Sequence, residues 1–280
     1  MQLERRKKEF KGGNMIIGSK NYDSRVYIMG ILNVTPDSFS DGGKYNSLDA
    51  ALYRAEQIVK EGGDIIDIGG ESARPNYTKI SDEEEIERTA PVIEAVTARF
   101  EQPVSIDTYK SKVAEAALKA GAVLVNDIWG FKYDKDMAAV TAKYKAACCL
   151  MHNRENTDYT DFVSNVVNDL AESVDIALKA GVDKEKICID PGVGFAKSYE
   201  QNLEIINKLE ALDKLGYPVL LGTSRKSVIG LTLDLPADER VEGTIATSVI
   251  GVMKGCRFLR VHDVEQNRRA VVMTEKILKG

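Results

Sequence analysis

Short apolar runs alternate with longer amphipathic segments from residue 26 to the end of the chain. The apolar runs are rich in β-branched residues and nearly continuous, which is typical of parallel strands buried on both faces. Eight rounds can be counted, with strands expected at VYIMGILN (from Val26), DIIDIGG (Asp64), PVSIDT (Pro103), VLVNDI (Val123), AACCLMH (Ala146), KICIDPG (Lys186), PVLLGTS (Pro218) and RFLRVHD (Arg257).

The segments between these runs have helical periodicity, and several stop just before a glycine. Ser81 followed by Glu84 predicts a capping box at the start of one of them. The expected helices are Ser47 to Glu61, Ser81 to Phe100, Lys110 to Ala120, Asp134 to Lys145, Phe162 to Ala180, Ser198 to Leu215, Ala237 to Lys254, and Val264 to the C-terminus.

Eight strands and eight helices, without a linker rich in Pro, Gly or Ser, predict a single α/β domain. The expected fold is a (β/α)8 barrel of the TIM type over residues 26–280. Residues 1–25 lie outside the repeat, and the fragments around Gly18 predict a short N-terminal hairpin that could plug the barrel floor. A chain of 280 residues could also form two domains, but the topology favours one.

Composition limits the partners and the compartment. A net charge of -5 gives no general attraction to nucleic acid or to an anionic membrane. No apolar run approaches the roughly 20 residues of a membrane span, and the charged N-terminus has no apolar stretch behind it, so we expect a cytoplasmic protein. Three of the four cysteines, Cys148, Cys149 and Cys188, fall in apolar runs and are expected to be reduced and buried, while two histidines and no CxxC pair argue against zinc.

Polar residues gather where the expected strands end, which is the active face of such barrels. Asp107, Asn126 and Asp190 are embedded in apolar strands, where an unpaired polar group costs on the order of several kcal/mol. They therefore need a ligand or a partner, whereas Asp127 and Asp263 are better interpreted as turn or cap residues. The other strand-end candidates are Asn33, Glu71, Arg74, Met151, His152, Ser224, Arg225, Lys226, Arg260 and His262.

These residues indicate two kinds of recognition. Carboxylate and amide acceptors suit a flat ligand with many N–H groups, such as a pterin, and Asp190 is the candidate for two parallel hydrogen bonds to a guanidine-like edge. The donors suit a phosphate or pyrophosphate, aided by the N-terminal amides of a helix that starts at about Asp263, although pairing with nearby carboxylates is an alternative for each. This donor group consists of Arg74, Lys226, Arg260 and His262.

The motifs resemble those of the dihydropteroate synthase family, Gram-positive type, over essentially the whole barrel. The fingerprint MGILNVTPDSFSDGG (from Met29) is long and specific, and GGESARP, SIDTYK, NDIWG, LMHNR, DPGVGFAK, GTSRKSVIG and RVHDV follow in the family's order. The resemblance implies that 4-aminobenzoate displaces pyrophosphate from 6-hydroxymethyl-7,8-dihydropterin pyrophosphate to give 7,8-dihydropteroate in folate biosynthesis. It also implies Mg²⁺, a homodimer and a sulfonamide target.

The same resemblance implies roles for individual residues. Ala73 departs from the family, which usually has threonine there, and Phe39 and Asp41 fall on the first mobile loop. The implied pterin site is Asp107, Asn126, Met151, Asp190, Gly222 and Lys226; the pyrophosphate site is Asn33, Arg74, Arg260 and His262, with Asn33 at the metal; the aminobenzoate or sulfonamide pocket is Phe39, Ala73, Arg74, Pro75, Phe195, Lys226 and Ser227; and the catalytic residues are Asp107, Lys226, Arg260 and His262.

Three other functions stay open at this point. A pterin-dependent methyltransferase has a similar barrel, but the GTSRK segment and the first-loop fingerprint argue against it. A non-catalytic pterin-binding relative would not be expected to keep every strand-end residue. An aldolase-like barrel would need a Schiff-base lysine inside a strand, and Lys226 lies beyond the strand end.

Overall fold

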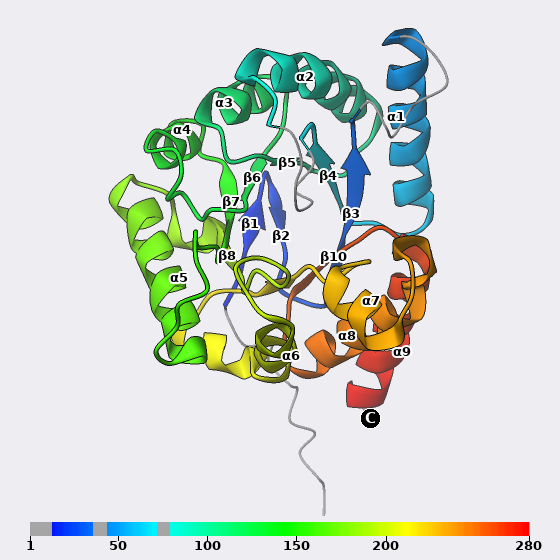
Figure 1. The fold of residues 1–280 in the computed structure, drawn as a ribbon. Helices are drawn as coiled ribbons and strands as arrows, with labels where there is room; N and C mark the ends of the chain where they lie inside the picture. Colours follow the sequence, from blue (N-terminus) through cyan, green and yellow to red (C-terminus); the bar gives the residue numbers. More distant parts are fainter. Residues whose placement is uncertain (1–12, 36–43, 72–78, 280) are drawn as a thin grey trace, which may run out of the picture.

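The computed structural model describes residues 13–35, 44–71 and 79–279, which form a closed barrel of parallel strands inside a ring of helices (Figure 1). The strands are hydrogen-bonded in the order β8-β7-β6-β5-β4-β3-β10-β9, and a parallel bridge from Ile189 to Val219 joins the two end strands. The predicted (β/α)8 barrel is confirmed. Its strands are β3 (Tyr27–Asn33), β4 (Ile65–Gly69), β5 (Val104–Asp107), β6 (Leu124–Asp127), β7 (Ala147–Met151), β8 (Ile187–Asp190), β9 (Leu220–Leu221) and β10 (Phe258–Val261).

The helices follow the strands with one addition to the prediction. The extra helix, α7 (Ser227–Leu233), lies in the GTSRKSVIG segment and ends at Asp234, whose φ is 55°. Two expected helices are each divided into an α-helix and a 3-10 turn. The helices are α1 (Lys44–Lys60), α2 (Asp82–Arg99), α3 (Ser111–Lys119), α4 (Met137–Lys143), α5 (Phe162–Lys179), α6 (Tyr199–Asn207), α7, α8 (Val241–Met253) and α9 (Val264–Lys279), with 3-10 turns at Lys184–Lys186, Leu209–Leu215 and Ala237–Glu239.

The N-terminus of α2 shows half of the predicted capping box. The Ser81 hydroxyl accepts from the backbone N–H of Glu84 at 3.1 Å, but the Glu84 carboxylate pairs with Arg88 one turn later. A complete capping box is found instead at α6, where Ser198 and Gln201 bond reciprocally. Both serines satisfy amides that a helix N-terminus leaves without an intrahelical acceptor.

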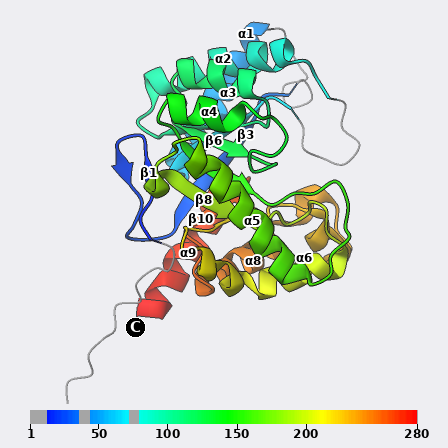
Figure 2. The same cartoon turned by 90° about the vertical axis from the view of Figure 1, so that its left-hand side faces the viewer.

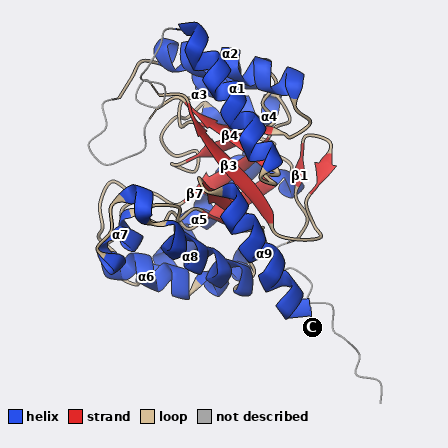
Figure 3. Ribbon diagram, turned by 90° about the vertical axis from the view of Figure 1, so that its right-hand side faces the viewer, coloured by secondary structure: helices blue, strands red, loops and turns tan. Residues whose placement is uncertain are grey.

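The predicted hairpin closes one end of the barrel. Its strands β1 (Ile16–Ile17) and β2 (Lys20–Asn21) are antiparallel, and they project beyond the barrel at the end opposite α7 (Figures 2 and 3). Met15, Ile17 and Tyr22 of this segment are buried in one cluster with barrel-interior side chains, so the hairpin forms an apolar floor. All four cysteines are free and buried, which confirms the expectation for Cys148, Cys149 and Cys188.

The barrel interior changes from apolar to polar along most of the strands. Side chains two residues apart face the same side of a strand, so the interior can be followed in layers. The side chain two residues after each floor residue faces the same interior and is in most cases polar. These side chains form a second layer, the mouth of the barrel. The floor layer contains Ile65, Leu124, Cys149, Cys188, Leu220 and Phe258, and the mouth layer contains Asp67, Asn126, Met151, Asp190, Gly222 and Arg260.

None of the helices that the structure describes is long and apolar enough to span a membrane.

Candidate active site

Arg260 lies between two carboxylates at the mouth. Its Nε donates to Asp67 Oδ2 at 2.6 Å, and one terminal nitrogen donates to Asp107 Oδ2 at 2.5 Å. Burial raises the pKa of Asp107 to about 7 in spite of the opposing charge of Arg260. The two aspartates raise the pKa of Arg260, although burial alone would lower it. The predicted residues Asp107 and Arg260 thus form an ion pair.

Asp67 is a site residue that the sequence analysis did not identify. It is fully buried, and its Oδ2 also accepts from Asn126 Nδ2 at 3.3 Å. Its Oδ1 has no hydrogen-bond partner among the residues that the structure describes. An aspartate between two apolar residues of a strand was a usable signal, but Asp67 stands two residues before the strand end rather than at it.

Asp190 is buried, and its two carboxylate oxygens have different neighbours. Its Oδ1 accepts from the backbone N–H of Gly192 at 2.7 Å. Its Oδ2 lies beside Gly222, where an added Cβ would stand 3.7 Å from this oxygen and 3.8 Å from Arg260 Cβ. Burial raises the pKa of Asp190, and the charge of Lys226 opposes that rise. With Met151 buried at the end of β7, the predicted pterin-slot residues come together here.

Lys226 precedes α7 and reaches across the mouth toward the β8–α6 loop. Its Nζ donates to the carbonyl oxygen of Val193 and lies 4.8 Å from the centroid of the Phe195 ring. Burial lowers its pKa to about 8, although the charge of Asp190 opposes this shift. Ser227 is the exposed first residue of α7. The structure therefore brings together the predicted pocket residues Phe195 and Lys226, and Ser227 follows Lys226 in the chain.

His262 is a neutral side chain rather than a second cation. Burial lowers its pKa to about 3, and the charge of Arg260 adds to this effect. Its Nδ1 is 2.9 Å from Ser224 Oγ, which also accepts from the His262 backbone N–H at 3.1 Å. A neutral imidazole can donate one hydrogen bond and accept another.

Several other strand-end residues stabilise loops. Glu71 accepts from Tyr109 at 2.6 Å and from Lys110 at 2.7 Å. Arg225 pairs with Asp263 at 2.5 Å. The carboxylate of Asp127 accepts two backbone N–H groups of its own loop at 2.8 Å each, so its interpretation as a turn residue is confirmed.

The described residues do not include the whole predicted site. Phe39, Asp41, Ala73, Arg74 and Pro75 lie outside them. Asn33 is described, and it is the exposed last residue of β3. Its Oδ1 would be 3.8 Å from a Cβ added at Gly69, and the carboxylate of Asp107 would border the same point at 3.7 Å.

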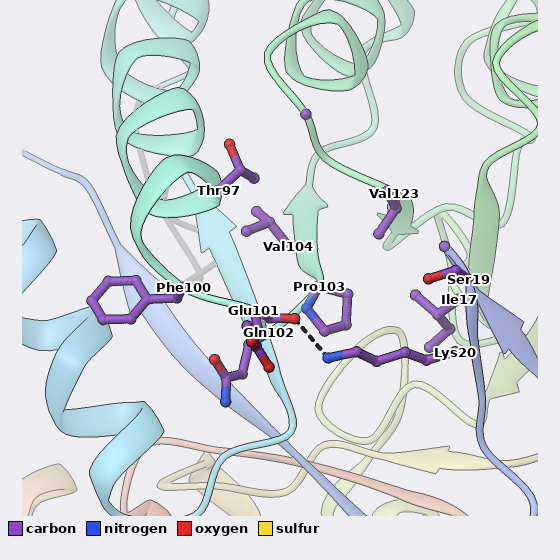
Figure 4. Close-up of a pocket in the computed structure, with 12 residues that line it drawn as sticks. Ile17, Ser19, Lys20, Thr97, Phe100, Glu101, Gln102, Pro103, Val104 and Val123 are labelled. Carbon is purple, nitrogen blue, oxygen red and sulfur yellow. Dashed lines mark hydrogen bonds between the residues drawn. The ribbon is translucent and has the colours of Figure 1, made fainter.

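A separate cavity of about 210 Å³ lies at the opposite end, between the hairpin and the turns that precede β5 and β6 (Figure 4). Ser19, Lys20, Phe100, Pro103 and Val123 are among its lining residues, and Lys20 Nζ donates to the carbonyl of Glu101 at 2.7 Å. None of the predicted site residues lines this cavity. It is part of the hairpin packing at the floor.

Comparison with known proteins agrees with this geometry. A family model described as pterin binding enzyme matches residues 29–262. The dihydropteroate synthase of Clostridium beijerinckii is 60% identical over 268 residues, which cover 95% of this chain and 100% of that protein. A crystal structure of dihydropteroate synthase from Clostridium difficile in the presence of pteroic acid has a TM-score of 0.90 and 51% identity, and the match covers 92% of this chain and 99% of that one.

A second solved structure extends the comparison to a more distant organism. The Yersinia pestis dihydropteroate synthase, in a complex with a sulfonamide drug, has a TM-score of 0.88 and 37% identity over 95% of this chain and 99% of that chain. Similarity of this extent spans the barrel and every described residue of its mouth. The chain therefore belongs to the pterin-binding enzyme family and, within it, to the dihydropteroate synthases.

Proposed function

We propose that this chain condenses 6-hydroxymethyl-7,8-dihydropterin pyrophosphate with 4-aminobenzoate, giving 7,8-dihydropteroate and pyrophosphate. One observation carries the proposal: Asp107, Asn126 and Asp190 lie at the carboxyl ends of β5, β6 and β8, close to the cations Lys226 and Arg260. Acceptors for a pterin and donors for a diphosphate thus share one opening. This pairing suits a substrate that carries both groups.

The pterin is expected to bind in the slot that ends at Gly222. Asp190 Oδ2 faces this slot, and a carboxylate can accept two parallel hydrogen bonds from an amino-pyrimidine edge. Asn126 and Asp107 supply further polar groups on the neighbouring strands β6 and β5. A side chain at position 222 would occupy the same space, so its glycine keeps the slot open.

The chemical step needs charge stabilisation at two points. Departure of pyrophosphate leaves positive charge on the methylene group, delocalised into the pterin, and the proposal assigns its stabilisation to the Asp107 carboxylate. It assigns stabilisation of the departing anion to Arg260, with His262 as a neutral donor. Since Arg260 donates to both Asp67 and Asp107, the position of its guanidinium is fixed, and little reorganisation would be needed during the reaction.

The arylamine is proposed to enter beside Phe195. The Phe195 ring and the Lys226 ammonium offer an apolar face and a positive charge, which match the ring and the carboxylate of 4-aminobenzoate. Because the Yersinia pestis relative is described with a sulfonamide drug, we propose that sulfonamides compete at this pocket. Ala73, where the family usually has threonine, is proposed to alter that competition.

Mg²⁺ belongs to the proposal because the residues fit a weakly held metal. The described residues contain no group of three or more His, Cys, Asp or Glu side chains that could hold a metal by themselves. Mg²⁺ instead favours one or two oxygen ligands plus substrate phosphates, and Asn33 Oδ1 offers such an oxygen at the mouth. When bound, the ion would neutralise charge on the pyrophosphate group.

The proposal is tested by product formation. Purified protein is incubated with dihydropterin pyrophosphate and labelled 4-aminobenzoate, with Mg²⁺ or with a chelator, and dihydropteroate is followed. Metal-dependent product supports both the reaction and the metal. Tight pterin binding without product would contradict the reaction and favour a non-catalytic pterin-binding protein.

A homodimer is proposed from exposed apolar side chains on two packed helices. Ile250 and Met253 of α8, with Met273 and Ile277 of α9, are exposed, Ile277 to 66%. The two helices lie side by side (Figure 1), so these residues can form one apolar surface.

A cytoplasmic location is also proposed, and it rests on the sequence alone.

The dimer is tested by light scattering after size exclusion. We expect twice the mass of one chain for the wild type and the mass of one chain for Ile277→Glu. Leu203→Glu on α6 is the matched control, because Leu203 is also an exposed apolar residue but lies on another helix. A wild-type protein of single-chain mass would contradict the proposal.

A further inference from the structure

A buried polar network lies behind the loop of residues 191–198, which joins β8 to α6 and carries Phe195. The loop runs directly against the end of β7. Gly192 has a φ of 69°, and a Cβ there would stand 1.9 Å from the carbonyl oxygen of His152, so only glycine fits. The loop that carries Phe195 is thus in direct contact with the residue at the centre of the network.

Lys197 holds this loop from within. Its Nζ is 2.8 Å from His152 Nδ1, 2.9 Å from the carbonyl oxygen of Gly192 and 3.0 Å from that of Phe195. The Tyr159 hydroxyl donates to the carbonyl of Ala196 at 2.7 Å. Three loop carbonyls are therefore fixed, and they lie on both sides of the Phe195 side chain.

His152 joins Lys197 to a carboxylate on α5. Its side chain is fully buried, and its Nε2 is 3.0 Å from Asp169 Oδ2, which also accepts from Arg154 at 2.5 Å. Burial lowers the pKa of His152 to about 4, so the ring is neutral. A neutral ring that accepts from Lys197 at Nδ1 can donate from Nε2 to Asp169, which satisfies every partner.

The opposite side of the loop faces Lys226. Its Nζ lies over the Phe195 ring and donates to the carbonyl of Val193 within the same loop. Among the described residues, no hydrogen bond joins the side chains of Lys197 or His152 to Arg260. The Lys197 and His152 side chains therefore contact the loop that carries Phe195, whereas Asp190 is reached, among the described residues, only by backbone groups: the N–H of Gly192 donates to Asp190 Oδ1 at 2.7 Å and that of His152 to the Asp190 carbonyl at 2.9 Å.

We propose that Lys197 and His152 are positioning residues that hold Phe195 against Lys226, and that they set the affinity for the arylamine substrate rather than for the pterin. The inference rests on the proposed function, which assigns Phe195 to the arylamine pocket. Neither residue touches substrate in this account. Their effect reaches the reaction through the backbone of the loop.

The main test is Lys197→Met, which keeps the length of the side chain and removes its donors. Lys186→Met is the matched control, because Lys186 Nζ also donates to a backbone carbonyl, that of Lys145 at 2.7 Å, but lies before β8 at the other end of the barrel. For Lys197→Met we expect the KM for 4-aminobenzoate to rise about tenfold, as for one or two lost hydrogen bonds. The Kd of a non-reactive pterin, measured by calorimetry, should change by less than about twofold.

A second variant keeps the test decisive if Lys197→Met does not fold. Tyr159→Phe removes only the hydroxyl that holds the Ala196 carbonyl, and it should raise the same KM about threefold with pterin affinity unchanged. Equal changes in the arylamine KM and the pterin Kd would overturn the inference, as would no change in either. If the wild type makes dihydropteroate and both variants have the wild-type KM for 4-aminobenzoate, only this inference is refuted. If the wild type makes no dihydropteroate, the proposed function is refuted as well.

Discussion

Two arginines three residues apart mark the two ends of the barrel. Arg257 is buried at the floor, where it donates to the carbonyl of Tyr22 at 2.9 Å, and burial lowers its pKa. Arg260 lies at the mouth and donates to Asp67 and Asp107, which raise its pKa. Arg257 binds backbone carbonyls and so holds the hairpin on the barrel. Arg260 binds carboxylates, and a pyrophosphate can compete with these for the guanidinium. The same residue type thus stabilises the fold at one end and, in the proposed function, binds the anion at the other.

The largest expected effect is at Asp107. Asp107→Asn keeps the shape but removes the charge that stabilises the cationic methylene, so kcat should fall about 10²- to 10³-fold. The far-ultraviolet circular dichroism and the melting temperature should stay close to those of the wild type. Wild-type turnover by the variant would exclude this role for Asp107.

The two arginines allow a direct comparison. Arg260→Met should weaken binding of inorganic pyrophosphate by about tenfold or more, because a charge-assisted contact is lost. Arg257→Met should leave that affinity unchanged and lower the free energy of unfolding by about 1–3 kcal/mol, because hairpin carbonyls lose their donor. Calorimetry and urea denaturation separate the two effects. An equal loss of affinity in both variants would show that the ends are not functionally distinct.

Two glycines test the same difference between the mouth and the floor of the barrel. Gly222→Ala would place a methyl group beside Asp190 Oδ2 and should weaken pterin binding about tenfold, as for an overpacked site. Gly18, in the floor hairpin, has a φ of 60°, so Gly18→Ala should cost about 1–2 kcal/mol of stability without a change in pterin affinity. The prediction fails if Gly222→Ala binds a pterin as tightly as the wild type.

The smallest expected effect is in the pH profile. Asp107, with its pKa raised to about 7 by burial, must be ionised, and Lys226, with its pKa lowered to about 8 by burial, must be protonated. Acid below the first value neutralises Asp107, and base above the second neutralises Lys226, so kcat/KM should be bell-shaped between them. Lys226→Arg should lose the alkaline limb, since arginine stays charged. A flat profile from pH 6 to pH 9 would argue against these two groups.

Much of the fold and of the mouth could be predicted from the sequence. The strands alternate with helices at a period that only parallel topology explains, and Asp107, Asn126 and Asp190 stand out because carboxylates and amides are rare in apolar strands. Their roles came from the resemblance rather than from spacing. Asp67 is also a carboxylate in an apolar strand, but it was missed because it lies inside the strand and not at its end. Helix α7 was not expected because the GTSRKSVIG segment was interpreted only as a motif.

Other features depend on tertiary contacts that no local pattern encodes. His152, Asp169 and Lys197 are far apart in the chain, and they meet only because β7, α5 and the β8–α6 loop pack together. The neutral state of His262 also follows from burial and from the nearby charge of Arg260, neither of which a sequence position reveals. In both cases the sequence shows the residue type but not the residues that it contacts in the fold.

The most direct test of the central claim, that the mouth carboxylates recognise a pterin, is calorimetry of a non-reactive pterin with the wild type and Asp190→Asn. Asparagine keeps the shape of Asp190 but cannot accept two parallel hydrogen bonds, so we predict measurable binding to the wild type and a loss of about 100-fold or more in the variant, with an unchanged melting temperature. Equal affinity of the two proteins, or no binding to the wild type, would contradict the account.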